Sequence, residues 1–593
     1  MMSFPALLCI ASIGLSSSLL TTHSHDDGKF KVFRITPVTN EQLELLATLY
    51  KNSADLQLDF WKAPTTAGQF ADVMVEPDMV EPFRDILTNH SIPHKVTIED
   101  VQKLTVEREG GDSLPKKHVP TGNPLLGSFF RRLKDYSSRN KAHYGFGEYH
   151  SYNEMIRWMN DIAYYYPTIA KVFTLGKTHE GRNIKGLKIG NPVWSTDKRV
   201  IWIDAGIHAR EWASVHTALY FIDQLISGYG HDPAITNYID NLNFYITPVL
   251  NPDGYEYSRS DISPQTRFWR KNRGPQICTK DRWHRERCCG GVDLNRNFDF
   301  HWGESGSSND MCSEIYEGPS AFSEPESRAV RDMLLSPELA GKTDAFITLH
   351  TYSQMWIHPY SHLKKTVPND IRDLESVGKN AVNALEDVYG TRYRFGTGAD
   401  ILYPSSGGSD DWSKSVAGVK YVYLLELRPG EEEWDGFLLD RRQLIPTGRE
   451  TWAGVRVVID AVLRTKRDVL SYNIPASQYL YQSTTKGADG YGRQIQTQLP
   501  NHMTLTETAI RSQRLRNEIR RRLNLMRGST SDRRRLEWRA LYPDVHLSRP
   551  LTHQSDCHDV SFWCSKWILA NPGICQTSSI YMNQNCKKSC NFC

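Results

Sequence analysis

The sequence predicts a large α/β domain between residues 145 and 465, where strand-like and helix-like segments alternate. The strand-like segments are nearly continuous apolar runs, at residues 200–204, 244–250, 345–349 and 421–425. A strand that is apolar on both sides belongs in a sheet covered by helices on both faces. We therefore expect a helix-flanked sheet to be the main architecture of the chain.

A smaller α/β unit is predicted before this domain, at residues 29–110. Strand-like and helix-like segments also alternate there, but each is short. The segments in chain order are 31–35, 41–52, 71–75 and 79–89.

The N-terminal residues 1–22 have the features of a signal peptide, with an apolar stretch at residues 4–11 followed by small residues. No other stretch reaches the roughly 18 to 20 apolar residues that a membrane helix needs. A net charge of +3 gives no indication of nucleic-acid binding. We expect a secreted protein that neither spans a membrane nor binds nucleic acid.

Two charged segments are predicted to connect the folded units. Residues 111–140 contain Lys116-Lys117 and Arg131-Arg132, which are plausible cuts for a trypsin-like or furin-like protease. Residues 470–550 are rich in Tyr, Gln, Ser and Gly and then become strongly basic. We expect this basic linker to be partly disordered. It is either a solvated, cleavable connector or an anchor on an anionic matrix or membrane surface.

The cysteines indicate an oxidising compartment. Without Cys9, which lies in the signal segment, ten remain in two clusters, four at residues 278–312 and six at residues 557–593. Clusters with an even number of cysteines behind a signal peptide are typical of disulfides. The alternative, a structural zinc module, requires paired Cys-x-x-Cys spacings, and only the last two cysteines have that spacing.

A His and a Glu three residues apart, His208 and Glu211, closely follow the apolar run at 200–205. Such a pair can present an imidazole and a carboxylate to one metal ion, beyond the carboxyl end of a strand where α/β sheets bind ligands. The pattern alone is weak evidence, because a chain with 20 His residues contains about one by chance. A second copy, His301 and Glu304, lies in a Gly- and Ser-rich loop.

Partners elsewhere in the chain strengthen the first pair. A catalytic zinc ion takes three protein ligands and leaves a position for water. His350 stands at the end of another apolar strand, so His208, Glu211 and His350 make a ligand set. A zinc-binding imidazole usually donates its other N–H to a carboxylate, and Asp293 is a candidate for His208.

Glu426 is a candidate general base. It is a carboxylate within the otherwise apolar run 421–427, and a base must take a proton from the metal-bound water. The alternative is a strand-end Glu that pairs with Arg428, since buried carboxylates are usually paired.

Together these motifs resemble a known family, the secreted metallocarboxypeptidases of the carboxypeptidase A/B type, which are made as zymogens. Residues 145–465 resemble the whole peptidase domain, which in that family is a mixed eight-stranded sheet flanked by helices. Residues 29–110 resemble the activation segment, including Leu56-Gln57-Leu58-Asp59-Phe60-Trp61 and Ile98-Glu99-Asp100-Val101-Gln102. The resemblance implies hydrolysis of C-terminal residues with one Zn²⁺ per chain.

The resemblance also implies roles for residues around the metal. Arg270 would polarise the scissile carbonyl and stabilise the developing oxyanion. Asn295 and Arg296 would hold the terminal carboxylate of the substrate, and Tyr403 would close over it. Arg210 would contact substrate beside the metal.

Asp410 is the residue that the resemblance places at the floor of the pocket for the terminal side chain. An acid there is similar to carboxypeptidase B, which removes C-terminal Lys or Arg. Gly398 falls where the B type keeps a small residue. We expect a preference for Lys or Arg; the alternative is that Asp410 is a solvated loop acid beside a generic pocket.

Two disulfides are expected in the peptidase domain. Cys289 and Cys312 match the internal disulfide of the family. Cys278 and Cys288 are additional, and we expect them to bridge each other.

Residues 557–593 resemble a ShKT domain, a six-cysteine toxin-like fold. Of the fifteen pairings that six cysteines allow, the resemblance implies Cys557–Cys593, Cys564–Cys586 and Cys575–Cys590. Channel-blocking toxins of this fold use a Lys-Tyr pair, but here Ile580 precedes Tyr581. We therefore expect a tethering or protein-binding role.

The sequence thus predicts a secreted zinc carboxypeptidase zymogen. Its expected partners are peptides or proteins with free C-termini, an activating protease, and an extracellular matrix or protein partner of the ShKT domain. The alternative is an extracellular matrix or cuticle-organising protein that acts mainly through this domain and the basic linker.

Overall fold

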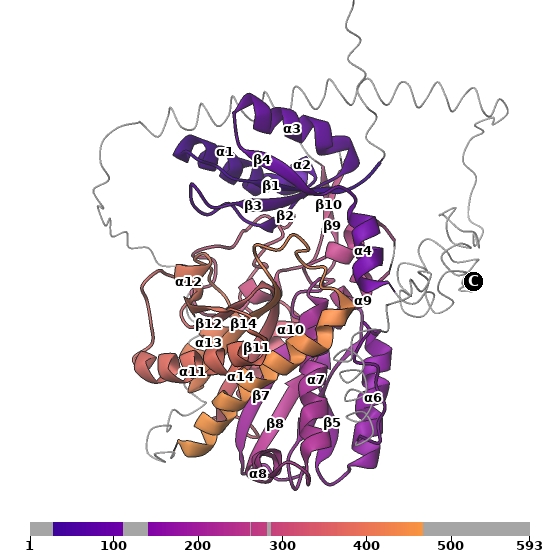
Figure 1. Cartoon of the computed structure of the whole chain (residues 1–593), viewed down its shortest axis with the longest axis vertical. Helices are drawn as coiled ribbons and strands as arrows, with labels where there is room; N and C mark the ends of the chain where they lie inside the picture. Colours follow the sequence, from indigo (N-terminus) through magenta and orange to yellow (C-terminus); the bar gives the residue numbers. More distant parts are fainter. Residues whose placement is uncertain (1–27, 111–139, 261, 281–285, 466–593) are drawn as a thin grey trace, which may run out of the picture.

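The computed structural model describes residues 28–110, 140–260, 262–280 and 286–465 (Figure 1). The predictions for the signal peptide, the linkers at 111–139 and 470–550, and the ShKT domain with its three disulfides lie outside the described residues. Within the part that is described, no helix is long and apolar enough to cross a membrane.

The smaller unit is an antiparallel sheet with the strand order β2-β3-β1-β4, packed against helices. Its elements in chain order are β1 (Lys31–Ile35), α1 (Asn40–Lys51), α2 (Ser53–Leu56), β2 (Leu58–Lys62), β3 (Ala71–Val75), a 3₁₀ turn (Pro77–Met79), α3 (Val80–Asn89), β4 (His94–Ile98) and α4 (Val101–Glu109). Figure 1 shows this unit lying across one edge of the larger sheet, with α1 and α3 on its far side.

Strand alternation divides the side chains of the smaller unit between two faces. Phe33 and Ile35 pack with the buried leucines of α1, whose start is capped by a reciprocal capping box between Thr39 and Gln42. Val32, on the opposite face, belongs to a cluster that includes side chains of the larger unit. The smaller unit therefore uses one face for its own core and the other for docking.

The larger unit is built on an eight-stranded mixed sheet with the strand order β13-β12-β14-β11-β7-β8-β6-β5. The four central strands, β14, β11, β7 and β8, are parallel to one another. The strands are β5 (Ala170–Lys177), β6 (Asn183–Ile189), β7 (Arg199–Ala205), β8 (Leu242–Thr247), β11 (Thr343–Ser353), β12 (Met355–His358), β13 (Arg394–Thr397) and β14 (Tyr421–Gly430). The carboxyl ends of the central strands meet at one edge, which the smaller unit covers (Figure 1).

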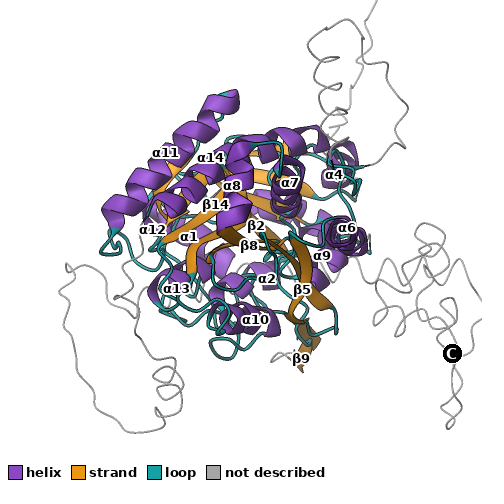
Figure 2. Cartoon of the chain, turned by 90° about the horizontal axis from the view of Figure 1, so that it is seen from below, coloured by secondary structure: helices purple, strands orange, loops and turns teal. Residues whose placement is uncertain are grey.

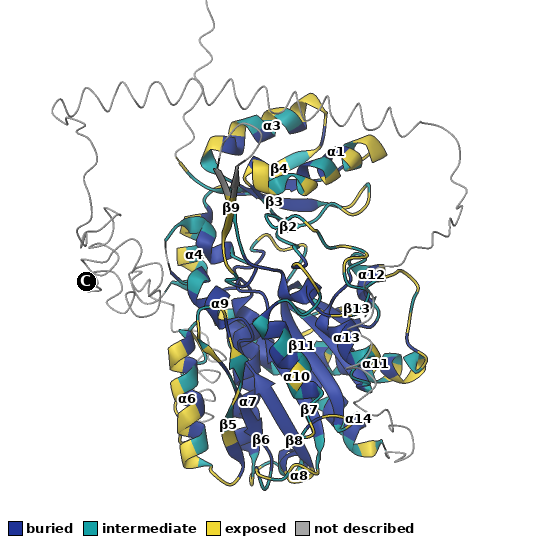
Figure 3. Ribbon diagram, turned by 180° about the vertical axis from the view of Figure 1, so that it is seen from behind, coloured by how far each residue is buried: buried dark blue, intermediate teal, exposed yellow. Residues whose placement is uncertain are grey.

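Helices cover both faces of this sheet, as the apolar runs predict (Figure 2). One face packs against α6 (Tyr152–Tyr165), α7 (Trp212–Gly228), α8 (Pro233–Asn241), α11 (Ile371–Tyr389) and α14 (Leu444–Arg464). The other face packs against α10 (Pro325–Leu334) and α13 (Ser409–Ser415). In β7, Ile201 and Ile203 belong to the first core and Val200 and Trp202 to the second, so the central strands are buried throughout (Figure 3).

Shorter elements form the loops at the carboxyl edge. They are α9 (Pro252–Ser258), α12 (Gly398–Ile401), and the 3₁₀ turns Pro264–Phe268, Leu294–Arg296 and Arg441–Gln443. A two-stranded hairpin, β9 (Ile277–Lys280) and β10 (Glu286–Cys289), extends from the same region.

The prediction of a strand at residues 244–250 is wrong at its C-terminal end. β8 stops at Thr247, because Pro248 has no N–H to continue the ladder. The chain then turns, and Leu250 donates instead to the carbonyl of Ala205, the last residue of β7.

Candidate active site

The carboxyl edge of the central sheet brings together residues that are far apart in the sequence. Strand β11 lies between β7 and β14, with Leu349 opposite Ala205 and His350 opposite Glu426. Gly206 follows β7 with a φ of +62°, and a side chain there would collide with Val215. The turn that this glycine permits carries His208 and Glu211 back towards β11.

His208, Glu211 and His350 converge on one point. Glu211 Oε1 lies 2.7 Å from His208 Nδ1, and Glu211 Oε2 lies 3.1 Å from His350 Nδ1. One ligand atom from each residue lies within 4.8 Å of the others, and all three side chains are buried. Two imidazoles and a carboxylate are the donor set of many catalytic zinc sites, so these residues fit a zinc ion.

The charges of this cluster suit a metal ion. Burial by itself raises the pKa of Glu211, but His208 and His350 outweigh this effect and hold it well below its usual range. Burial lowers the pKa of His208, with Arg270 adding to the effect, so this imidazole is neutral as a metal ligand must be. Burial also opposes the charge on His350, but Glu211 raises its pKa to about 9, so a metal ion that binds here has to displace a proton from this imidazole.

Asp293 supports the cluster from outside. Its Oδ1 lies 3.0 Å from His208 Nε2, which is the contact that the sequence suggests. Its Oδ2 accepts hydrogen bonds from Arg270 at 2.8 and 3.1 Å. Burial disfavours the charged form of Asp293, but Arg270 and His208 keep its pKa well below the usual range. One carboxylate thus orients both His208 and Arg270.

The position predicted for His350 needs a correction. It does not stand at the end of its strand, because β11 continues to Ser353. The strand extends there because β14 also runs on, to Gly430, and pairs with it across Thr351 and Ser353. Strand β11 pairs with β14 both before and after His350. His350 is therefore held within the sheet, whereas His208 lies on a turn.

Other groups of His and carboxylate residues lie elsewhere in the described structure, and two of them compare with this cluster. His301 and Glu304, the second His-x-x-Glu, form a largely exposed pair 2.7 Å apart. The exposed His179 and the buried Glu324 and Glu326 form a cluster that could also hold a metal ion. There, however, the Glu324 carboxylate already accepts hydrogen bonds from His179, Asn272 and Ser323. The group at His208, in which all three side chains are buried, is therefore the better zinc site.

Glu426 faces the same cluster from β14. Burial raises its pKa to about 8, with Glu211 adding to the rise and His350 and Arg270 opposing it. Its Oε2 makes no hydrogen bond within the described part of the chain. The alternative pairing with Arg428 is wrong, because that side chain makes a forked ion pair with Glu450. Glu426 is therefore available for chemistry.

The expected substrate-binding residues and the expected catalytic Arg270 line one pocket beside this cluster. These residues are Arg210, Arg270, Asn295, Arg296, Tyr403 and Asp410. Asn295 Oδ1 accepts a hydrogen bond from the backbone N–H of Ser409 at 2.9 Å, which joins the turn carrying Asn295 and Arg296 to the start of α13. The guanidinium of Arg296 is braced by backbone carbonyls, at 2.8 Å from both Gly306 and Asn295.

Asp410 lies buried in the first turn of α13. Burial raises its pKa to about 7, and the neighbouring Asp411 adds to the rise. Its Oδ2 has no hydrogen-bond partner among the described residues. Asp411, in contrast, accepts hydrogen bonds from the N–H of Ser361 at 2.8 and 3.0 Å. The two adjacent acids thus differ, since one braces a loop and the other faces the pocket.

The sequence did not identify several residues in the pocket wall. Apolar and small side chains from two strands and two loop segments contribute, namely Ile357, Leu424, Ser361 and Leu402. Leu424 belongs to the same strand as Glu426 and points to the same side, so strand alternation was a usable signal for it. The others come from segments that no local pattern connects with the site.

The smaller unit reaches into this pocket. Asp59 of β2 accepts a hydrogen bond from Arg210 at 3.0 Å, and Trp61 stacks on Phe268 with ring centroids 4.9 Å apart. Tyr50 at the end of α1 also lines the pocket. The sequence motif containing Asp59 and Trp61 carried the resemblance, but no role for either residue followed from it.

Further contacts clamp the two units together away from the pocket. Glu109, the last residue of α4, forms a forked ion pair with Arg267 at 2.6 and 2.7 Å. Arg34 pairs with Asp72 inside the smaller unit and also donates to the carbonyl of Glu431 at 2.9 Å. These buried charges are paired, as burial requires.

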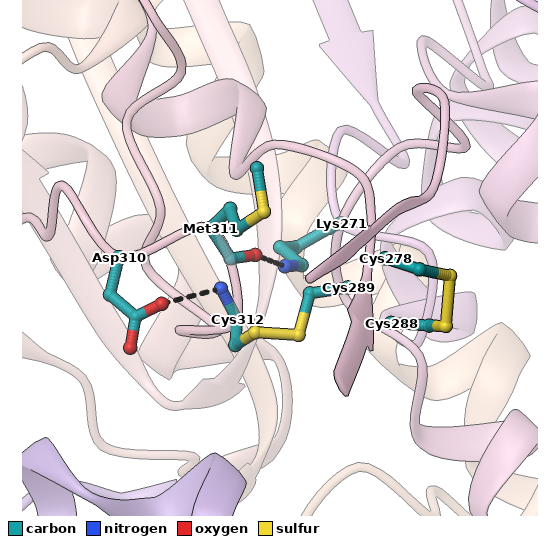
Figure 4. Close-up of a disulfide and its surroundings, with 7 residues drawn as sticks. All are labelled: Lys271, Cys278, Cys288, Cys289, Asp310, Met311 and Cys312. Carbon is teal, nitrogen blue, oxygen red and sulfur yellow. Dashed lines mark hydrogen bonds between the residues drawn. A yellow bond between two sulfur atoms is a disulfide. The ribbon is translucent and has the colours of Figure 1, made fainter. Parts of the chain in front are cut away.

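Both disulfides expected in the larger unit are present in the structure, Cys278–Cys288 and Cys289–Cys312 (Figure 4). Cys278 and Cys288 are directly opposite each other in the hairpin. Beside the second disulfide, Lys271 donates to the carbonyl of Met311 at 2.9 Å. The segment that carries Arg270 is thereby tied to the loop after Cys312, which lines the pocket.

A family model described as zinc carboxypeptidase matches residues 155–454, half of the chain. The chain belongs to the zinc carboxypeptidase family. Models of the carboxypeptidase activation peptide and of a ShK domain-like module match residues 33–107 and 556–593. The protein is therefore a metallocarboxypeptidase that uses zinc. Its peptidase domain has the helix-flanked mixed sheet of the family and is preceded in the chain by an activation peptide.

Named relatives and solved structures agree with this assignment. Carboxypeptidase B of Astacus astacus is 42% identical over 317 residues, 54% of this chain and 98% of the relative. Carboxypeptidase A2 of Rattus norvegicus is 35% identical over 432 residues, 73% of this chain and 93% of the relative. The structure of thrombin activatable fibrinolysis inhibitor matches with a TM-score of 0.61 at 30% identity, covering 74% of this chain and all of that one. Carboxypeptidase A of Helicoverpa armigera matches with a TM-score of 0.59 at 27% identity, over 74% of this chain and 99% of that one.

Proposed function

We propose that the activated enzyme removes C-terminal Lys or Arg residues from peptides or proteins. The observation that carries the proposal is Asp410, a buried carboxylate that lines the substrate pocket with one oxygen unpartnered among the described residues. A buried carboxylate strongly favours a cationic partner. Gly398 lines the same pocket without a side chain, which leaves room for a long terminal residue.

The proposed ligands of the zinc ion are His208, Glu211 and His350. When bound, zinc polarises the scissile carbonyl and lowers the pKa of a bound water. Glu426 lies beside these ligands with a pKa raised by burial, so it is a stronger base than an exposed carboxylate. We assign it the transfer of a proton from the attacking water to the leaving amine.

Positive groups surround the remaining part of the pocket. Arg270 is held by Asp293 on one side, and its Nη1 lies 3.9 Å from Glu211, so it is fixed beside the metal ligands to stabilise an oxyanion. Asn295 and Arg296 are assigned to the terminal carboxylate of the substrate, for which a braced guanidinium is well suited. Tyr403 would cover that carboxylate, and Arg210, which lines the same pocket, would contact the substrate beside the metal.

We also propose that the protein is secreted and is activated by proteolysis in the segment after α4. The two disulfides of the larger unit support an oxidising compartment. The C-terminal module is proposed to bind a matrix component or another protein. The matrix-organising alternative is less well supported, because a protein acting only through that module has no need of an intact hydrolytic site.

The proposed specificity is tested with the trypsin-activated protein and a set of peptides that differ only in their C-terminal residue. We expect kcat/KM for Lys and Arg to exceed that for Phe and Leu by about 100-fold or more. A chelator should abolish all release, and added zinc should restore it. Equal or faster release of Phe or Leu would contradict the Lys/Arg preference, whereas activity that survives the chelator would contradict the zinc ligands.

The contact between Asp59 and Arg210 predicts how the activation peptide inhibits the enzyme. Asp59 pairs with the guanidinium of Arg210, which we assign to substrate binding. The peptidase domain of the Asp59→Asn variant should therefore bind its activation peptide about 10- to 100-fold more weakly. The activity of the uncut zymogen on a short peptide ending in Arg should rise accordingly. Glu81→Gln is the matched control, because Glu81 pairs with Arg84 on the exposed side of the same unit. An uncut Asp59→Asn protein as inactive as the control would overturn this role.

A further inference from the structure

His350 has a second ring nitrogen whose surroundings differ from those of His208. Both imidazoles direct Nδ1 at Glu211. The outer nitrogen of His208 contacts Asp293 directly. The outer nitrogen of His350, Nε2, lies 3.3 Å from Thr348 Oγ1 instead. A zinc-binding imidazole needs a fixed acceptor for its outer N–H, and a hydroxyl alone is a weak one.

The sheet places a carboxylate behind this hydroxyl. Thr348 and His350 are two residues apart on β11, so their side chains lie on the same face. Asp204 of β7 is directly opposite Thr348 in the parallel ladder, and its carboxylate interacts with the Thr348 hydroxyl. Asp204, Thr348 and His350 are each at most 1% exposed, so water does not compete.

The hydrogen bonds that link His350, Thr348 and Asp204 can run in one direction only. With a metal on Nδ1, Nε2 carries the ring proton and must donate it to Thr348 Oγ1. The Thr348 hydroxyl then has its own proton free for Asp204. Asp204 Oδ2 accepts from Trp202 Nε1 at 2.6 Å, whereas Oδ1 has no other hydrogen-bond partner in the described structure. An ionised Asp204 can therefore accept the hydrogen bond of the Thr348 hydroxyl.

We propose that Asp204 and Thr348 are positioning residues for the zinc site, forming a hydrogen-bonded relay that orients His350 as Asp293 orients His208. The inference rests on the zinc ligands proposed above. The carboxylate makes the imidazole a better donor to the metal, and the two hydrogen bonds fix the ring plane and the tautomer. Each variant that breaks the relay should lower zinc affinity about 10- to 100-fold.

The test measures zinc affinity of the full-length protein by competition with a chromophoric chelator. Thr348→Val has nearly the same shape but no hydroxyl, and Asp204→Asn keeps its shape but loses its charge. We expect both to bind zinc about 10- to 100-fold more weakly, and Thr348→Ser to recover the affinity of the original protein. The absorption spectrum of the cobalt-substituted protein should shift in Thr348→Val and return in Thr348→Ser.

Asp223→Asn is the matched control for a buried carboxylate. Asp223, on α7, accepts hydrogen bonds from Asn140 and Ser227. Burial raises its pKa to about 6, as it does for Asp204. This variant should leave zinc affinity unchanged. If Asp204→Asn does not fold, the comparison of Thr348→Val with Thr348→Ser decides the question.

The outcomes separate the relay from the ligand set. Unchanged zinc affinity in His350→Ala would refute the proposed ligands, and the relay with them. Loss of zinc in His350→Ala together with unchanged affinity in Thr348→Val and Asp204→Asn would refute the relay alone. Weak binding that Thr348→Ser fails to recover would show that the side chain acts only through packing, and this too would overturn the relay.

Discussion

The Glu426→Gln variant of the activated enzyme is expected to lose activity by about 10²- to 10⁴-fold in kcat, the range that a positioned general base contributes. The amide has the shape of the carboxylate but cannot accept the proton of the attacking water. Glu426 is not among the three proposed ligands, so zinc content should remain one ion per chain. The measurement is kcat on a peptide ending in Arg, with zinc determined by atomic absorption.

Glu256→Gln is a suitable control for this experiment. Glu256 is also buried, and it accepts a hydrogen bond from the N–H of Tyr152 that an amide oxygen can accept as well. Its substitution should leave kcat close to that of the original enzyme. If Glu426→Gln kept more than about a tenth of the activity, another group would have to be the base.

The Asp410→Ile variant is expected to reverse the preference for the terminal residue. Without the carboxylate, a Lys or Arg side chain enters a buried pocket unpaired, which costs about 3–5 kcal/mol. This corresponds to a loss of about 10²- to 10⁴-fold in kcat/KM for Lys and Arg. The rate for Phe or Leu should rise in the same variant. Asp410→Asn separates the effect of charge from that of shape. It should lose activity on terminal Lys and Arg without gaining activity on terminal Phe.

The same carboxylate predicts how the preference depends on pH. The pKa of Asp410 is raised to about 7 by burial and by Asp411, so the carboxylate is mostly neutral below pH 7 and charged above it. The ratio of kcat/KM for Arg to that for Phe should therefore increase between pH 6 and pH 8. In Asp410→Ile the ratio should not change with pH over this interval. A ratio that decreases with pH in the original enzyme would show that Asp410 does not recognise the cation.

Much of the fold was predictable because its signals are local. The apolar runs that became β7, β11 and β14 are short enough to be strands and too apolar for an exposed sheet face. The end of β8 was mispredicted because the apolar run continues through Pro248, and an apolar count does not register a missing N–H. The outer strand β13 is short and only partly buried, so it has no comparable signal.

The candidate site was predictable from residue chemistry but not from spacing alone. His208 and Glu211 have the same spacing as His301 and Glu304, and only the first pair is buried beside a third ligand. That difference depends on where β11 lies in the sheet. That Glu426 is not paired with Arg428 depended likewise on the tertiary structure, because Arg428 pairs instead with Glu450 of α14.

The sequence by itself determined which chemical groups are available: two imidazoles, their carboxylate partners, a buried acid for a cationic substrate, and strands to carry them. These follow from residue types and from short-range periodicity, which are local properties. Only the tertiary structure decided that Asp204 stands behind Thr348, that Asp59 meets Arg210, and that Glu426 faces His350. Such contacts depend on the register between strands and on the docking of two units, and shifting a register by one residue would turn each side chain to the opposite face.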